Sequence, residues 1–219
     1  MHIAILTFDG FNELDSLIAL GILNRIKLPG WRVSIASPAA KVRSMNGVVI
    51  ESHCGLQDAA QADAVVVGSG LLTREVVADP ALMAQLRLDP RRQLIGAQCS
   101  GALILAKLGL LEDVPACTDL TTKPWVQEAG VRVLNQAFFA HGNVATAGGC
   151  MASQYLAAWI IARLVGREAA ADALHYVAPV GEKDEYVSRA MRNIEPGLQS
   201  GASGPHSVAA PPDRTARVQ

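Results

Sequence analysis

The stretch LIGAQCSGALILAKLGLL, residues 94–111, decides how this chain folds. It opens with the apolar run 94–97, which is typical of a buried strand, and closes with apolar residues at helical spacing. Cys99 stands between the two parts, and three small residues follow it directly: Ser100, Gly101 and Ala102. The stretch therefore predicts a strand, a tight corner and a helix, with a thiol at the corner.

The segments on either side extend this pattern of strands and helices. Apolar and β-branched runs predict further strands, and helical periodicity predicts further helices. The predicted strands cover residues 2–8, 31–37 and 62–70, with a hairpin around Asn46-Gly47 and two strands around 141–143, and the predicted helices cover 13–26, 150–165 and 168–176. Strands that alternate with helices predict an α/β fold whose mostly parallel sheet has helices on both faces.

Length and composition fit one domain followed by a tail. The chain has 219 residues, half of them apolar, and a formal net charge of −1, so neither nucleic acid nor a membrane is an expected partner. The N-terminus lacks the basic and apolar segments of a signal peptide, which predicts a cytoplasmic protein. We expect an α/β domain over residues 1–195 and a disordered tail over 196–219, which is rich in Gly, Ser, Ala and Pro.

Cysteine spacing argues for free thiols. The four cysteines stand at positions 54, 99, 117 and 150 and match neither a zinc-binding pattern nor a disulfide framework. We therefore expect no metal and no organic cofactor.

Cys99 is the candidate nucleophile. Ligands of open α/β sheets bind at the carboxyl ends of the strands, and the small-x-Cys-x-Gly pattern has the form of a nucleophile elbow. The start of the following helix favours the thiolate, which predicts a lowered pKa for Cys99. The alternative is that Cys99 is a small buried apolar residue, as many free cysteines are. Cys150 competes for the role because it also stands near a helix start, although its surroundings do not form an elbow.

Asp15 is the candidate partner of the thiol. The segment after the first strand carries three acids at the same edge of the sheet, and two of them have ordinary explanations: Asp9 as a turn residue and Glu13 as a charge in the first helical turn. Asp15 has apolar neighbours in the sequence and is expected to be partly buried, protonated and able to share its proton with Cys99.

The turn Gly68-Ser69-Gly70 ends another predicted strand at this edge. It does not match a phosphate-binding loop, so we expect the Gly70 N–H to hold developing negative charge, together with the Ser100 N–H.

These segments, taken in order, resemble the ThiJ/PfpI superfamily over about residues 1–180. The resemblance rests on Phe8 to Asp15, on Cys99-Ser100, on Leu108 to Leu111 and on His141 to Gly149, and it is nearest in appearance to the isocyanide hydratase branch. It implies a flavodoxin-like sandwich, a homodimer, a cysteine nucleophile at Cys99, an acid at Asp15 and oxyanion donors at Gly70 and Ser100.

Three departures from the family pattern bear on the substrate, and one of them is the strand-end turn Gly68-Ser69-Gly70, which stands in place of Pro-Gly-Gly. The protease-like branch has His directly after the nucleophile, where this chain has Ser100, and this argues against peptidase activity. A substrate-contacting position that is His or Trp in many members is Asp119 here.

The resemblance thus implies a hydro-lyase without a cofactor that converts a small isocyanide to an N-substituted formamide. Two alternatives stay open: glyoxalase- or deglycase-like activity on α-oxoaldehydes, and a redox or small-molecule sensor without turnover.

Overall fold

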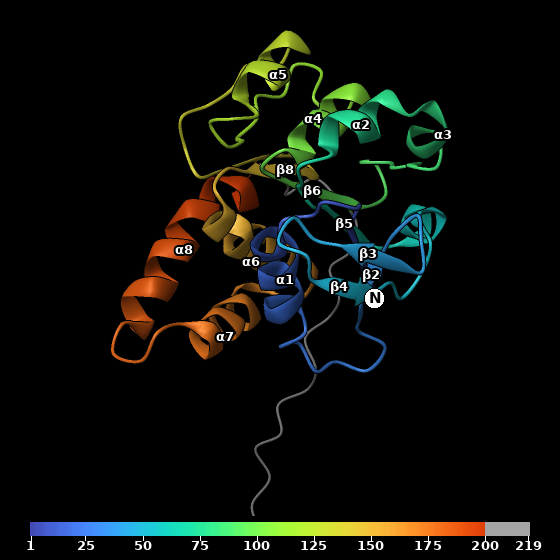
Figure 1. The fold of residues 1–219 in the computed structure, drawn as a ribbon. Helices are drawn as coiled ribbons and strands as arrows, with labels where there is room; N and C mark the ends of the chain where they lie inside the picture. Colours follow the sequence, from blue (N-terminus) through green and yellow to red (C-terminus); the bar gives the residue numbers. More distant parts are fainter. Residues whose placement is uncertain (200–219) are drawn as a thin grey trace, which may run out of the picture.

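The computed structural model describes residues 1–199, which form a central sheet between two layers of helices (Figure 1). The sheet has six strands in the order β2-β1-β5-β6-β8-β7, and only β7 runs antiparallel to its neighbour. A separate antiparallel hairpin consists of β3 and β4. The strands are β1 (His2–Leu6), β2 (Arg32–Ala36), β3 (Lys41–Arg43), β4 (Val49–Glu51), β5 (Ala64–Val67), β6 (Leu94–Gln98), β7 (Phe138–His141) and β8 (Val144–Ala147).

The helices divide between the two faces of the sheet. Helices α1, α6, α7 and α8 pack on one face, and η1, α2, α3, α4 and α5 on the other. Their bounds are α1 (Glu13–Leu23), η1 (Leu56–Gln61), α2 (Thr73–Ala78), α3 (Pro80–Met83), α4 (Gly101–Lys107), α5 (Lys123–Glu128), η2 (Cys150–Ala152), α6 (Ser153–Leu164), α7 (Arg167–Val177) and α8 (Lys183–Gln199).

Strand β1 shows why both faces are covered. Ile3 and Ile5 pack into the apolar core on the α1 and α6 side, whereas Ala4 and Leu6 pack into the core on the α4 side. Successive side chains of a strand point to opposite faces, so a strand that is apolar throughout needs a helical layer on each side. The α/β architecture expected from the sequence is confirmed.

The predicted boundary between domain and tail, at residue 196, falls within a helix. Helix α8 continues through Pro196 to Gln199, and it packs on β7 and α6. Gly197 is buried there, and a Cβ at this position would lie 2.7 Å from Cβ of Ala140. The Trp159 indole N–H also donates to the carbonyl of Gly197 (3.4 Å). Residues 200–219 of the predicted tail lie outside the described residues.

The carboxyl ends of β1, β5, β6 and β8 meet at one edge of the sheet, because these strands are parallel neighbours. Two isolated bridges tie this edge together, since Phe11 pairs with both Ser44 and Gly70. The edge therefore collects the loops that the sequence analysis singled out. Within residues 1–199, none of the helices combines the length and apolar character that crossing a bilayer requires.

Candidate active site

Cys99 stands in a strained corner between β6 and α4. Its φ is 46°, in the left-handed region that residues other than glycine rarely adopt. The corner is fixed from two sides, because Cys99 N–H donates to the carbonyl of Ala147 (2.8 Å) and the Thr118 hydroxyl donates to the carbonyl of Cys99 (2.8 Å). At Gly101 a Cβ would lie 2.5 Å from the Val67 carbonyl oxygen, so only glycine allows α4 to approach β5 this closely. The corner thus has the geometry of a nucleophile elbow.

Asp15 is fully buried on α1 and lies behind the thiol. The Ser69 hydroxyl donates to its Oδ2 in a short hydrogen bond. Its other oxygen, Oδ1, is buried without a hydrogen-bond partner. The thiols of Cys99 and Cys150 lie close enough to interact with this carboxylate, yet neither reaches Oδ1 with hydrogen-bond geometry. Glu13, by contrast, is bound at the surface by Ser44 and Asn46.

Both members of the expected pair have raised pKa values. Burial is the main cause for Asp15, and the hydrogen bond from Ser69 and the nearby thiols offset part of the rise in its pKa. Burial also raises the pKa of the Cys99 thiol, and the negative charge of Asp15 adds to the rise. The prediction of a lowered pKa for Cys99 is therefore wrong. Desolvation and a neighbouring carboxylate raise the pKa more than the dipole of α4, a helix of seven residues, lowers it.

Cys150 is part of the same cluster, although its sequence context did not favour it. One ligand atom each of Asp15, Cys99 and Cys150 lies within 4.8 Å of the other two. The Asn12 side-chain amide donates to Cys150 Sγ (3.2 Å), while its Oδ1 accepts from Leu14 N–H and caps α1. All four cysteines are free, and the two outside this cluster are Cys54 and Cys117.

The predicted oxyanion donors form a hydrogen-bonded set of their own. The Gly70 N–H donates to Ser100 Oγ (3.1 Å), and Ser100 Oγ also lies 2.7 Å from the Thr73 hydroxyl. The Gly70 N–H is thus occupied by a side chain in this structure, and a ligand that uses it has to displace Ser100 Oγ. The Ser100 N–H remains a predicted donor.

A cavity of about 290 Å³ opens over the thiol. Cys99, Cys150 and Ser100 line it, together with Asp119 and Trp125 from the loop and helix that follow α4. The Asp119 carboxylate accepts from the N–H groups of residues 121 and 122 (both 2.9 Å), so it shapes this wall while facing the predicted substrate space. No lysine, arginine or histidine is among the described residues that line the cavity.

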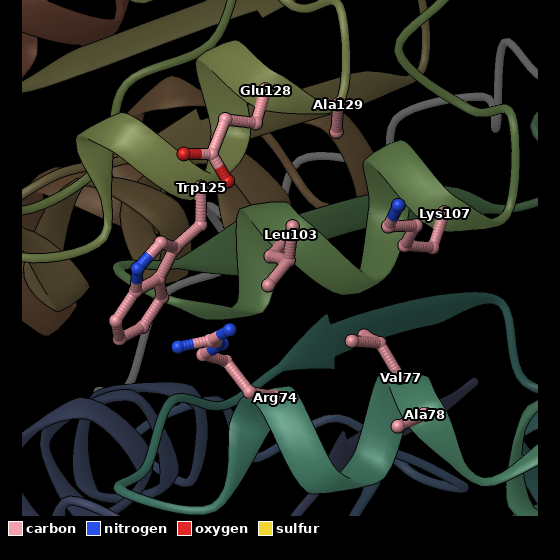
Figure 2. Close-up of a pocket in the computed structure, with 8 residues that line it drawn as sticks. All are labelled: Arg74, Val77, Ala78, Leu103, Lys107, Trp125, Glu128 and Ala129. Carbon is pink, nitrogen blue, oxygen red and sulfur yellow. The ribbon is translucent and has the colours of Figure 1, made fainter.

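A second hollow shares Trp125 with the thiol cavity, and Figure 2 shows the residues that line it. Arg74 from α2 stacks on the Trp125 ring at 5.2 Å, and Lys107 and Glu128 also line the hollow. The hollow is thus lined by charged side chains of both signs, whereas Asp119 is the only charged residue that lines the thiol cavity among the described residues.

The sequence matches the model of the DJ-1/PfpI family over residues 1–163. The chain belongs to this family. No curated protein matches the sequence.

Solved structures of family members share the fold of this DJ-1/PfpI protein. DJ-1 of Schizosaccharomyces pombe is 15% identical, with a TM-score of 0.70 over 82% of this chain and 100% of that chain. A ThiJ/PfpI family protein from Pseudomonas syringae is 19% identical, with a TM-score of 0.71 over 91% and 90%. Oxidized DJ-1 of Toxoplasma gondii is 19% identical, with a TM-score of 0.69 over 80% and 97%. These likenesses confirm the flavodoxin-like α/β fold, and they do not distinguish branches of the family.

This DJ-1/PfpI site combines residues that were predicted from the sequence with residues that were not. Cys99, Asp15, Gly70, Ser100 and Asp119 all lie at or directly behind the cavity. Three polar residues around the sulfurs and the carboxylate had no predicted role, namely Asn12, Ser69 and Gln98, and Cys150 was predicted only as a competitor of Cys99. Their common signal is position, because each stands where a strand of the parallel sheet ends or just beyond it.

Proposed function

We propose that this DJ-1/PfpI protein hydrates a small, uncharged isocyanide to an N-substituted formamide, with Cys99 as nucleophile and Asp15 as proton carrier. The observation that carries the proposal is a thiol and a buried carboxylate side by side at a cavity without basic lining residues. Such a cavity offers no counter-ion to an anionic substrate, and the negative charge of Asp119 repels such a substrate.

The raised pKa of Cys99 places the proton on sulfur at the start of the proposed cycle, because burial and the charge of Asp15 both disfavour the thiolate. Asp15 then acts first as a base. As Cys99 Sγ attacks the terminal carbon of the isocyanide, Asp15 takes the thiol proton and passes it to that carbon.

This first step gives a thioimidate, R–N=CH–S–Cys99, and leaves Asp15 ionised. In the second step Asp15 draws a proton from water while the hydroxide adds to the same carbon, and the nitrogen takes up the proton. The resulting tetrahedral adduct, R–NH–CH(OH)–S–Cys99, breaks its C–S bond. It releases the N-substituted formamide, R–NH–CHO, and the hydroxyl proton returns to the sulfur. One water is consumed in each cycle, and the Cys99 thiol is regenerated.

A substrate screen tests the proposal. Purified protein is incubated with aryl and alkyl isocyanides and, separately, with methylglyoxal, and formamide and lactate are measured by chromatography with mass detection. We expect formamide formation that saturates with isocyanide concentration and disappears in Cys99→Ser. Cys54→Ser is the matched control, because Cys54 lies outside the cavity.

Lactate from methylglyoxal without formamide from any isocyanide would replace this proposal by a glyoxalase-like activity. Oxidation of Cys99 without turnover of either substrate class would favour a sensor. Formamide production that persists in Cys99→Ser would remove the nucleophile from the mechanism.

We also propose that the chain forms a homodimer, as its family resemblance implies. Large apolar side chains are exposed that a second copy would cover. Met45 (40% exposed) and Leu71 (64%) line the cavity, and Leu14 (50%) and Met151 (59%) are exposed as well. Light scattering at micromolar concentration is expected to give twice the chain mass, and a monomer under these conditions would contradict the proposal.

A further inference from the structure

We propose that Asp15, Cys99 and Cys150 form a binding site for one thiophilic divalent cation, such as Zn²⁺ or Cd²⁺. The three side chains come from distant parts of the sequence, which is why cysteine spacing gave no sign of a metal site. The fold brings them together: Cys99 follows β6, Cys150 follows β8, and Asp15 lies on α1.

Distance supports a shared ligand. One donor atom of each residue lies within 4.8 Å of the other two. Tetrahedral zinc binds sulfur at about 2.3 Å and oxygen at about 2.0–2.2 Å, so a cation between the three needs the donors to move inward by rotation of side chains. Cys150 is the side chain with room for this movement, because it is only half-buried and begins the short η2 helix.

The carboxylate supplies an independent sign of a missing ligand. Asp15 is fully buried, and its Oδ1 has no hydrogen-bond partner while Oδ2 is held by Ser69. A buried polar atom without a partner is costly and rare in folded proteins. A cation beside the two sulfurs would satisfy Oδ1, and the bond from Ser69 would orient the carboxylate toward it, as outer-shell groups do in metal sites.

The two sulfurs also have outer partners that suit thiolates. Asn12 Nδ2 donates to Cys150 Sγ (3.2 Å), and Gln98 Nε2 lies 3.5 Å from Cys99 Sγ while it donates to the Gly149 carbonyl (2.8 Å). Two soft sulfurs and one carboxylate select zinc-like ions over Mg²⁺ and Ca²⁺, which prefer oxygen ligands. The cavity leaves the fourth position open to water or a small ligand.

Binding exchanges protons for metal: the cation takes the place of one proton on each thiol, and both protons leave to solvent. The cation then occupies Cys99 and Asp15 together. If the proposed hydration is correct, the metal-bound protein is inactive, and this consequence rests on the proposed function. Binding itself does not rest on it.

Metal titration of the reduced protein tests the site without any turnover assay. Isothermal titration with Zn²⁺ is expected to show one ion per chain, and Cd²⁺ is expected to give the ultraviolet sulfur-to-metal absorption of two thiolates. Cys150→Ser should weaken binding by at least about 100-fold and halve the Cd²⁺ absorption, since loss of an outer-shell partner alone costs about 10–100-fold. Asp15→Asn should weaken binding by about 10–100-fold with both sulfurs retained.

Cys54→Ser is the matched control and should bind as the parent does. Circular dichroism of each variant separates loss of the fold from loss of a ligand, and Cys150→Val provides a second replacement at a half-buried position. Parent-like affinity in both Cys150 variants, a Cd²⁺ absorption of one thiolate in the parent, or loss of binding in Cys54→Ser would each overturn the site. Zn²⁺ binding in a protein that hydrates no isocyanide would leave the site standing and remove only the proposed function.

Discussion

Two neighbouring corners of the sheet each carry a cysteine, and they are built in opposite ways. At the end of β6 the chain turns at Cys99 itself, whose φ is 46°. At the end of β8 it turns at Gly149, whose φ is 89°, and Cys150 follows on η2 with an ordinary helical backbone. The two strands are parallel neighbours, so both corners point to the same edge.

The difference determines what each thiol can do. A residue other than glycine in the left-handed region costs about 1–3 kcal/mol and persists only where its surroundings fix it. Cys99 is held in this way and is 4% exposed, whereas Cys150 is half-buried and carries no backbone strain. The Gln98 side chain connects the corners, because it reaches both Cys99 Sγ and the Gly149 carbonyl. One corner therefore positions a reactive atom, and the other supplies a movable neighbour.

Removal of each sulfur is the strongest test of this comparison. Cys99→Ala should lower turnover by at least about 10⁴-fold, the scale for loss of a nucleophile that works with a partner. Cys150→Ala should keep turnover within about tenfold of the parent, because it touches the pair and takes no part in bond formation. Steady-state rates on the substrate found by the screen decide. Equal losses in both variants would show that the two corners do not differ in role.

The carboxylate between the corners gives the next largest effect. Asp15→Asn keeps the volume of the side chain and removes its capacity to accept and return a proton, so turnover should fall by roughly 100-fold or more. Glu13→Gln is the control on the same helix, and it should retain most activity because Glu13 is engaged by Ser44 and Asn46 outside the cavity. A lower kcat in Glu13→Gln than in Asp15→Asn would show that Glu13, and not Asp15, carries the proton.

The glycines of the two corners sharpen the comparison further. Gly101→Ala would place a Cβ 2.5 Å from the Val67 carbonyl oxygen, which forces α4 away from β5 and displaces Cys99. We expect a loss of stability of about 1–3 kcal/mol and up to about 100-fold lower turnover. Gly149→Ala meets no atom within 4 Å and has only the cost of its φ of 89°, about 1–3 kcal/mol. Thermal melts with rate measurements should show similar destabilisation, with the larger loss of turnover in Gly101→Ala.

Alkylation across pH gives the smallest expected effect. The pKa of Cys99 is raised, so at a given pH less of it is thiolate, and iodoacetamide should label the half-buried Cys150 before Cys99 near pH 8. Asp15 contributes to the raised pKa of both thiols, so Asp15→Asn should lower both pKa values and speed labelling of both by up to about tenfold. Cys54 is the internal control, because the rise in its pKa comes from burial and Asp58. Faster labelling of Cys99 than of Cys150 in the parent would show that the pKa of Cys99 is lowered, as the position of Cys99 at the start of a helix suggested.

Local sequence pattern was enough for most of the fold. Apolar runs and helical spacing predicted the strands and helices that frame the site, because burial on one or both faces leaves a period that can be read directly. Helix α8 was missed in full, since no helix was predicted after residue 176, and Pro196 and Gly197 suggest a chain break near its end. Its last turn is instead held by packing of Gly197 against β7 and Trp159, a long-range contact that no local pattern contains.

For the site, the sequence by itself determined which residue types stand at strand ends, and that was enough to select Cys99 and Asp15. Only the tertiary structure decided their chemistry. The pKa of a thiol depends on burial and on charges that the fold brings near it, and here both act against the start of α4. The pairing of Cys99 with Cys150 was likewise decided by the adjacency of β6 and β8 in the sheet, since strand order is a property of the packed chain and not of either segment.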